Sequence, residues 1–80
     1  MNIEVRLFAT LREYLPTGSE RTCARIDMPA CASIVDVLTK LGIPEAAAFL
    51  VLVNGSYEAD RRRKLEDGNV LSIWPPIGGG

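Results

Sequence analysis

The 80-residue chain contains no histidine, and this absence removes the commonest general base of enzymes that work near neutral pH. Catalytic systems that pair a serine or cysteine nucleophile with histidine are therefore excluded. Cysteine is scarce as well, with only Cys23 and Cys31. Zinc sites and iron–sulfur clusters draw most of their ligands from cysteine and histidine, so the sequence predicts no bound metal. We expect both cysteines to be free thiols in a reducing compartment, and no cofactor to be bound.

Long apolar runs and a surplus of one charge are also missing. Residues 46–53 are apolar throughout, but this run is far shorter than the ~20 residues of a spanning helix. Nine basic and ten acidic residues give a formal net charge of −1, whereas nucleic-acid-binding domains normally carry a strongly basic face. The first residues alternate like a strand and do not resemble a signal segment. We therefore expect a cytoplasmic protein that binds neither nucleic acid nor membranes.

What is present is the composition of one small globular domain. Hydrophobic residues make up 48% of the chain and charged residues 24%. A chain of this length has room for one core only, so we expect residues 1–80 to form a single domain. The sequence has neither a phosphate-binding loop nor a dinucleotide-binding motif. If the chain takes part in chemistry, its own atoms must be the substrate.

Two alternating segments open the chain. Apolar residues at positions 3, 5, 7 and 9 alternate with residues 2, 4, 6 and 8, which predicts a half-buried strand. Phe8 breaks the pattern, because it lies on the otherwise polar side. After a loop that contains Pro16 and Gly18, residues 22–28 alternate again and place Cys23 on the outer side. The two segments predict a hairpin.

A helix follows. Ser33 and Asp36 have the spacing of a capping box, in which each side chain bonds a backbone amide of the other residue. Apolar residues at 34, 37, 38 and 41 then form one stripe, and Gly42 and Pro44 predict the end of the helix. Residues 45–48 could add a further helical turn. The stripe predicts a helix that packs on one face of a sheet.

The second half of the chain returns to strands. Residues 49–53 predict a buried strand, and Asn54-Gly55 is a preferred two-residue turn leading to a short strand at 56–58. Residues 70–74 predict the last strand, which ends at Pro75 because proline has no amide hydrogen to donate.

The element order predicts an α+β fold of the β-grasp, or ubiquitin-like, type. We expect a mixed sheet with the first and last strands parallel in its middle and one main helix crossing it. In that arrangement residues 75–80 would form an extended, flexible C-terminal tail. Between the strands, the basic run Arg61 to Lys64 is either a solvated turn or a contact for an acidic patch on a partner.

The chain finishes on "WPPIGGG". Glycines have no side chains, so such a tail could enter a channel too narrow for other residues. Its end is a carboxylate, which is a poor electrophile until it is activated. Adenylation would convert it into a mixed anhydride open to attack by a sulfur donor, and the product would be a thiocarboxylate. An inert tail is the alternative reading of the same residues.

Three stretches resemble the MoaD and ThiS sulfur-carrier family, most closely the small subunits of molybdopterin synthase. "VRLFATLREYLP" is similar to that family's first strand and following turn, and "LEDGNVLSIWPP" to its last turn and strand. The ending is similar to its terminal glycine pair. The likeness covers nearly the whole chain.

The resemblance implies a carrier that is not catalytic by itself. An E1-like adenylating enzyme (MoeB- or ThiF-like) would use ATP to adenylate Gly80, with Gly78 and Gly79 completing the reactive tail. A sulfur donor would then form the thiocarboxylate. The large subunit of molybdopterin synthase (MoaE-like) would accept the tail and deliver sulfur to a pterin precursor of the molybdenum or tungsten cofactor.

Side-chain parity and the resemblance together predict a partner-binding surface. Parity in the last strand puts Leu71 and Ile73 inward and leaves Trp74 on the face where Phe8 also points. In the family, the positions matching Phe8 and Trp74 pack against partner proteins. Arg12 follows the first-strand motif and is a candidate for a polar contact. The tail residues Pro75, Pro76 and Ile77 complete the predicted partner-binding set.

Other functions remain open on the sequence alone. The tail of a ubiquitin-like protein modifier would be adenylated in the same way and then joined to lysines of other proteins. Sulfur carriers also serve thiamine and cysteine synthesis. A plain interaction module is the third possibility. These functions differ in the molecule that accepts the sulfur or the activated C-terminus. The partner protein, and not this chain, determines which molecule that is.

Overall fold

Five strands form one mixed sheet in the order β2-β1-β5-β3-β4 in the computed structural model, which describes residues 1–76. β1 (Asn2–Leu7) lies antiparallel to β2 (Cys23–Asp27) and parallel to β5 (Val70–Trp74). β3 (Leu50–Val53) lies antiparallel to both β5 and the two-residue β4 (Ser56–Tyr57). The first and last strands are therefore parallel neighbours in the middle of the sheet, as the sequence predicts.

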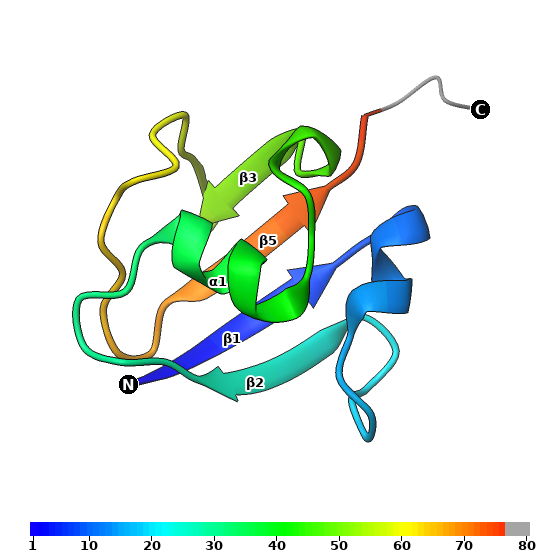
Figure 1. Ribbon diagram of the computed structural model, residues 1–80, viewed down its shortest axis with the longest axis horizontal. Helices are drawn as coiled ribbons and strands as arrows, with labels where there is room; N and C mark the ends of the chain where they lie inside the picture. Colours follow the sequence, from blue (N-terminus) through cyan, green and yellow to red (C-terminus); the bar gives the residue numbers. More distant parts are fainter. Residues whose placement is uncertain (77–80) are drawn as a thin grey trace.

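The helix α1 (Ile34–Leu41) crosses one face of this sheet (Figure 1). Its capping box is formed: the Ser33 hydroxyl accepts the Asp36 amide at 3.3 Å, and the Asp36 carboxylate accepts the Ser33 amide at 2.8 Å. Gly42 ends the helix in the left-handed region with φ 78°, which glycine adopts without a steric penalty. A 3₁₀ turn, η2 (Glu45–Ala47), follows where the sequence allowed a further helical turn.

The core fills the space between α1 and the sheet. In the strands every second side chain points into it, as the pleat requires. The helix contributes Ile34, Val37 and Leu38, all at most 1% exposed. The inward strand residues that are at most 2% exposed are Ile3, Val5, Leu7, Val51, Val53, Leu71 and Ile73. The opposite face, here called the open face of the sheet, carries no helix of the described chain (Figure 1).

The structure corrects the sequence-based prediction after β1. Alternation predicted that Ala9 continues the strand and points inward, but Ala9 is exposed, has φ 53° and begins a 3₁₀ helix, η1 (Ala9–Tyr14). This segment was predicted to be a loop. Leu11 drives the difference, because it is only 2% exposed and attaches η1 to the core.

The prediction of a buried strand at 49–53 was also partly wrong. The strand begins at Leu50, and Phe49 is 63% exposed. Leu50 and Leu52 are half-buried, because they point to the open face while Val51 and Val53 point to the core. The Asn54-Gly55 turn is confirmed, with φ 51° and 84°.

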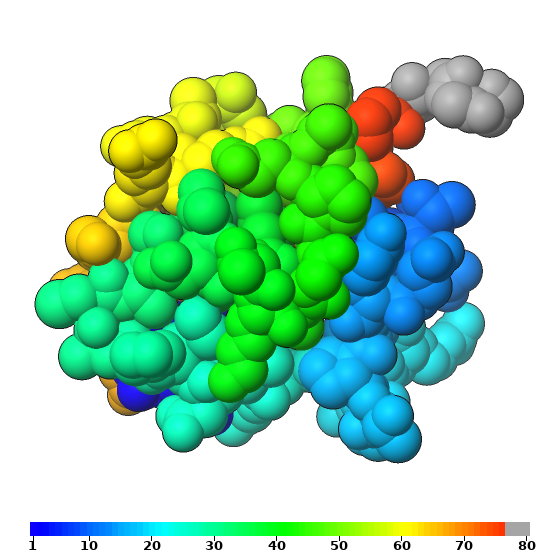
Figure 2. Space-filling model, in the orientation of Figure 1, coloured from blue at the N-terminus to red at the C-terminus, as the bar shows by residue number. Residues whose placement is uncertain are grey.

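In the space-filling view from the side of α1, the helix and the segments next to it cover this face of the sheet (Figure 2). Within residues 1–76, no helix is long and apolar enough to span a membrane. In the same range, no cluster of three or more His, Cys, Asp or Glu side chains has a metal-binding arrangement.

Candidate functional site

The site lies at the edge of the sheet where β1 and β5 both end. The two strands are parallel and pair Leu7 with Ile73, so their carboxyl ends share one edge. The Phe8 amide donates to the Ile73 carbonyl at 3.2 Å, which extends this pairing by one residue beyond β1. Residues from opposite ends of the chain thus meet where the polypeptide leaves the sheet (Figure 1).

Phe8 and Trp74 form the centre of this site. Their rings stack with centroids 4.3 Å apart and an interplanar angle of 5°. Phe8 has an extended backbone, with φ −122° and ψ 158°, so its side chain keeps the alternation of β1 and points to the open face. Both rings are half-buried, and each covers part of the other. The two aromatic residues that parity placed on one face are therefore in contact.

Apolar side chains extend this surface across the open face. Leu50 pairs with Trp74 in the register of β3 and β5, and Leu52 pairs with both Ser72 and Tyr57. Tyr57 is 66% exposed, and the two leucines are half-buried. We call Phe8, Trp74, Leu50, Leu52 and Tyr57 together the aromatic face. Contiguous apolar surface on a small domain marks a contact site for another protein.

Sequence reasoning missed three members of the aromatic face: Leu50, Leu52 and Tyr57. Residues 49–53 are all apolar, so composition gave no sign that two leucines point away from the core. Alternation was the available signal. Val51 and Val53 are both β-branched and lie two residues apart, so they point to the same side of the strand and leave Leu50 and Leu52 on the other side. Tyr57 follows the turn residues and was treated only as part of a short strand.

The structure also places the remaining predicted contact residues. Arg12 is an exposed residue of η1, and its Nε donates to the Ala9 carbonyl at 3.2 Å. η1 follows β1 directly and contacts β5, so the segment that carries Arg12 lies beside these two strands. Pro75 is half-buried and Pro76 is exposed. Ile77 and the glycines Gly78, Gly79 and Gly80 lie outside the described residues.

A charged cluster lies farther along the open face. Arg6 Nε lies 2.6 Å from a carboxylate oxygen of Glu4, and this bond lowers the pKa of Glu4 and raises that of Arg6. Partial burial, followed by the nearby Glu4 charge, raises the pKa of the Cys23 thiol. A thiol with a raised pKa stays protonated and is a weak nucleophile. Both cysteines are free, and Cys31 is exposed.

Comparison with protein families identifies the family of this chain. Residues 1–78 match the family described as Mut7-C ubiquitin. The chain belongs to this family. Comparison with curated proteins gives no match. Because the match covers almost the whole chain, the predicted resemblance to the ubiquitin-like MoaD and ThiS carriers is confirmed at the level of the family.

Solved structures agree on the fold. The crystal structure of SAMP1 from Haloferax volcanii is 26% identical, with a TM-score of 0.70 over 100% of both chains. The solution structure of the HVO 2177 protein of the same organism is 29% identical, with a TM-score of 0.77 over 100% of this chain and 87% of that chain.

A third neighbour is a subunit of a complex. The complex of subunits 1 and 2 of molybdopterin-converting factor from Helicobacter pylori contains a chain that is 22% identical, with a TM-score of 0.66 over 100% of both chains. At that identity the match shows the fold alone. The predicted β-grasp architecture is confirmed, and it is the fold of sulfur carriers and of small archaeal modifiers.

Proposed function

We propose that this chain is a sulfur carrier that acts as the small subunit of a molybdopterin synthase, with the carboxylate of Gly80 as the reacting group. The observation that carries the proposal is the Phe8–Trp74 stack at the end of β5. It provides an apolar contact surface directly before the segment that continues to three glycines. A partner bound there would receive the reactive segment in a fixed position.

Family and fold support this proposal. The Mut7-C ubiquitin match covers residues 1–78, and a subunit of a molybdopterin-converting factor has the same fold. That neighbour is bound to a second subunit, which supports a similar partner, a synthase large subunit, for this chain. We propose the aromatic face as the surface that binds this partner and the E1-like enzyme in turn.

The chemistry would proceed in two steps on the chain's own atoms. In the first step, a carboxylate oxygen of Gly80 attacks the α-phosphate of ATP. Pyrophosphate is the leaving group, and the product is an acyl adenylate at Gly80. A sulfur donor at the oxidation level of sulfide then attacks the acyl carbon, a C–S bond forms, the C–O bond to AMP breaks, and a proton is released. The chain itself supplies the acyl group and the docking surface.

A second candidate function is that of a protein modifier. It is favoured by the likeness to the small archaeal modifier protein 1 of H. volcanii, which is 27% identical with a TM-score of 0.71. Both functions share the adenylation of a terminal glycine. They diverge afterwards, because a lysine amine of another protein would take the place of sulfur and form an isopeptide bond.

Intact-mass measurement of the protein purified from its native host tests the proposal. A sulfur carrier is expected to show a fraction in which one oxygen of the Gly80 carboxyl is replaced by sulfur, with the change confined to the C-terminal fragment. Alkylation of the thiocarboxylate should shift that fraction only. A mass that shows further residues after Gly80, or a terminus found only in branched peptides on lysines, contradicts the carrier function. The second result would support the modifier.

A further inference from the structure

β2 lies at one edge of the sheet, and only one of its two sides is paired. At one end of its pairing with β1, the Met28 amide donates to the Met1 carbonyl at 2.8 Å. At the other end, the Leu7 amide donates to the Thr22 carbonyl at 2.8 Å. Hydrogen-bonded pairs recur at every second residue of an antiparallel ladder, so the even-numbered residues of β2 face β1. The peptide groups that point to the free edge are those of the odd-numbered residues: Cys23, Arg25 and Asp27.

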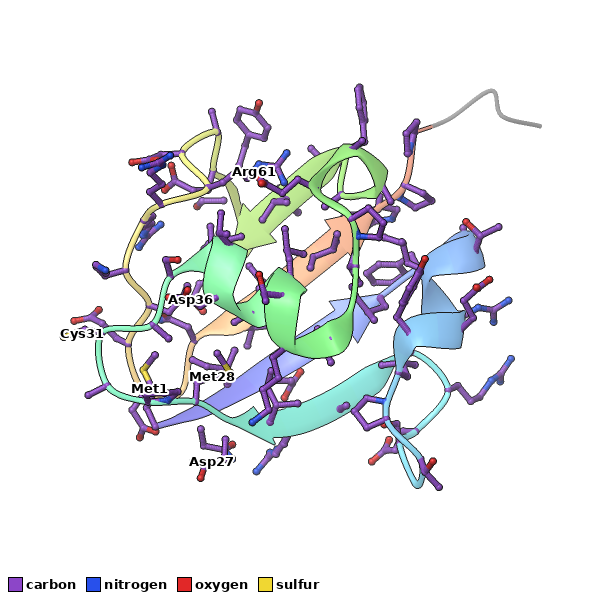
Figure 3. The ribbon with its side chains drawn as sticks, viewed as in Figure 1. Met1, Asp27, Met28, Cys31, Asp36 and Arg61 are labelled. Atoms are coloured by element: carbon purple, nitrogen blue, oxygen red, sulfur yellow. The ribbon has the colours of Figure 1, made fainter. Side chains whose placement is uncertain are left out.

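The two outer residues of this free edge already have partners for their carbonyls. The Glu20 amide, in the loop before β2, donates to the Cys23 carbonyl at 3.0 Å. Lys40 Nζ donates to the Asp27 carbonyl at 2.7 Å, although Lys40 lies in the last turn of α1. Figure 3 shows Asp27 at the outer edge of the sheet, where its side chain is 91% exposed. An acceptor at each end of the edge is therefore occupied.

The free edge of a strand is a template for pairing with another chain. A closed pair of identical edges has two-fold symmetry, so the β2 strands of two copies would run antiparallel. Hydrogen-bonded pairs would then form between the outward residues of the two strands. The registers that give more than one such pair set Arg25 opposite Cys23, Arg25 or Asp27 of the second copy. Every one of these registers uses the carbonyl of Cys23 or of Asp27.

The charges on the strand favour one of these registers. Arg25 opposite Arg25 brings two positive charges together, which destabilises a strand pair. Arg25 opposite Cys23 needs a carbonyl that already accepts a backbone amide. Arg25 opposite Asp27 brings opposite charges together on each side of the two-fold axis, and both side chains are exposed. A second copy therefore complements the edge, and the carbonyl that it needs is the one that Lys40 holds.

We propose that the free edge of β2 is a pairing surface for a second copy of this chain, and that Lys40 keeps this surface closed by bonding the Asp27 carbonyl. A strand that reached this carbonyl would have to displace a charged ammonium. Natural proteins use lysine at sheet edges to prevent such pairing, and here the lysine comes from the helix. The inference is independent of the proposed function, because β2 contributes no residue to the aromatic face.

Sedimentation of the full chain over a range of concentrations tests the inference. The wild type is expected to remain a monomer. Lys40→Ala is expected to form dimers about tenfold more tightly or better, which is the effect of removing one hydrogen bond from a charged donor. Alanine is a good helix former, so α1 should be retained, and circular dichroism checks this. Lys40→Arg keeps a charged donor and should stay monomeric.

Lys64→Ala is the matched control. It makes the same charge change at another exposed lysine and should also stay monomeric. Hydrogen exchange then identifies the surface, because the amides of Arg25 and Asp27 should become protected with rising concentration in Lys40→Ala and not in the wild type. The double variant Lys40→Ala/Arg25→Glu sets like charges opposite each other and should lose the association.

Several results would overturn the inference. One is a Lys40→Ala variant that associates no more than the wild type, whether both are monomers or both are dimers. Another is equal association in Lys64→Ala, which would assign the effect to net charge. Dimers of Lys40→Ala that persist after Arg25→Glu, or that leave the Arg25 and Asp27 amides unprotected, would place the contact outside the β2 edge.

Discussion

At the residue scale, two half-buried rings decide how the end of β5 is presented. Phe8 and Trp74 lie at the ends of neighbouring parallel strands, and stacking at 4.3 Å removes part of each ring from water. The surface that remains is apolar and continuous with Leu50 and Leu52. A contact of this kind stabilises the domain modestly and leaves area for a partner, which distinguishes it from a core contact.

Replacing either ring tests this assignment. Phe8→Ala or Trp74→Ala should weaken binding to the large synthase subunit by about 2 kcal/mol or more, as for interface hot spots. The free energy of unfolding should fall by less than the ~3 to 5 kcal/mol of a fully buried aromatic residue. Titration calorimetry and urea denaturation measure the two quantities. Variants that unfold readily but bind normally once folded would assign the rings to the core.

At the element scale, the start of α1 is fixed by polar groups as well as by packing. Ser33 and Asp36 satisfy each other's amides, and the next two amides, of Ile34 and Val35, donate to the carbonyls of Arg63 and Arg61. The first turn of a helix leaves its amides without intrahelical partners, so these bonds account for the sharp start at Ile34. The bond from the Ser33 backbone amide, followed by that of its hydroxyl, lowers the pKa of Asp36.

A pH dependence of stability follows from this cap. Because the folded pKa of Asp36 is lowered, its contribution is present above the ordinary aspartate pKa of about 3.9 and is lost as the pH falls through the folded value. Asp36→Asn should therefore be less stable than wild type at pH 7, and the difference should shrink on acidification below about pH 4. Urea denaturation across this range is the measurement. Glu13→Gln, at an exposed position of η1, is the control, and a pH-independent difference for Asp36→Asn would contradict the account.

At the scale of the whole molecule, the parallel pairing of β1 with β5 joins the two ends of the chain. It places the strand that leads into the proposed reactive segment in the middle of the sheet, between β1 and β3. α1 covers one face of the sheet (Figure 1). The strand register places the residues of the aromatic face together on the opposite face. β5 therefore ends at Trp74, which is itself part of the aromatic face.

Changes at the tail should separate folding from function. The buried core of the described residues ends at Ile73, so deletion of Gly79 and Gly80 is expected to leave the thermal midpoint nearly unchanged. The deletion, or one residue added after Gly80, should abolish adenylation, because the reacting carboxylate is removed or displaced. Pyrophosphate exchange and thermal melts measure both effects. Normal adenylation of the extended chain would contradict the proposed chemistry.

Much of the architecture is local, and local patterns were sufficient to predict it. The alternation of β1 and β5, the capping box at Ser33 and Asp36, and the Asn54-Gly55 turn each depend on side chains close together in the chain. Element order then restricts the topology to very few arrangements, which is why the parallel pairing of the first and last strands was predicted correctly. Parity along two strands also placed Phe8 and Trp74 on one face.

What only the tertiary structure decided concerns residues whose environment comes from distant segments. The sequence determined the α+β fold and the apolar residues at the end of the last strand. Leu11 turned a predicted loop into η1 because a core surface was available to it, and Phe49 stayed exposed because the sheet begins one residue later. Arg61 reaches Phe49 across the fold, although its neighbours in sequence indicated only a basic turn. Such contacts depend on which surfaces meet after folding, and periodicity carries no information about them.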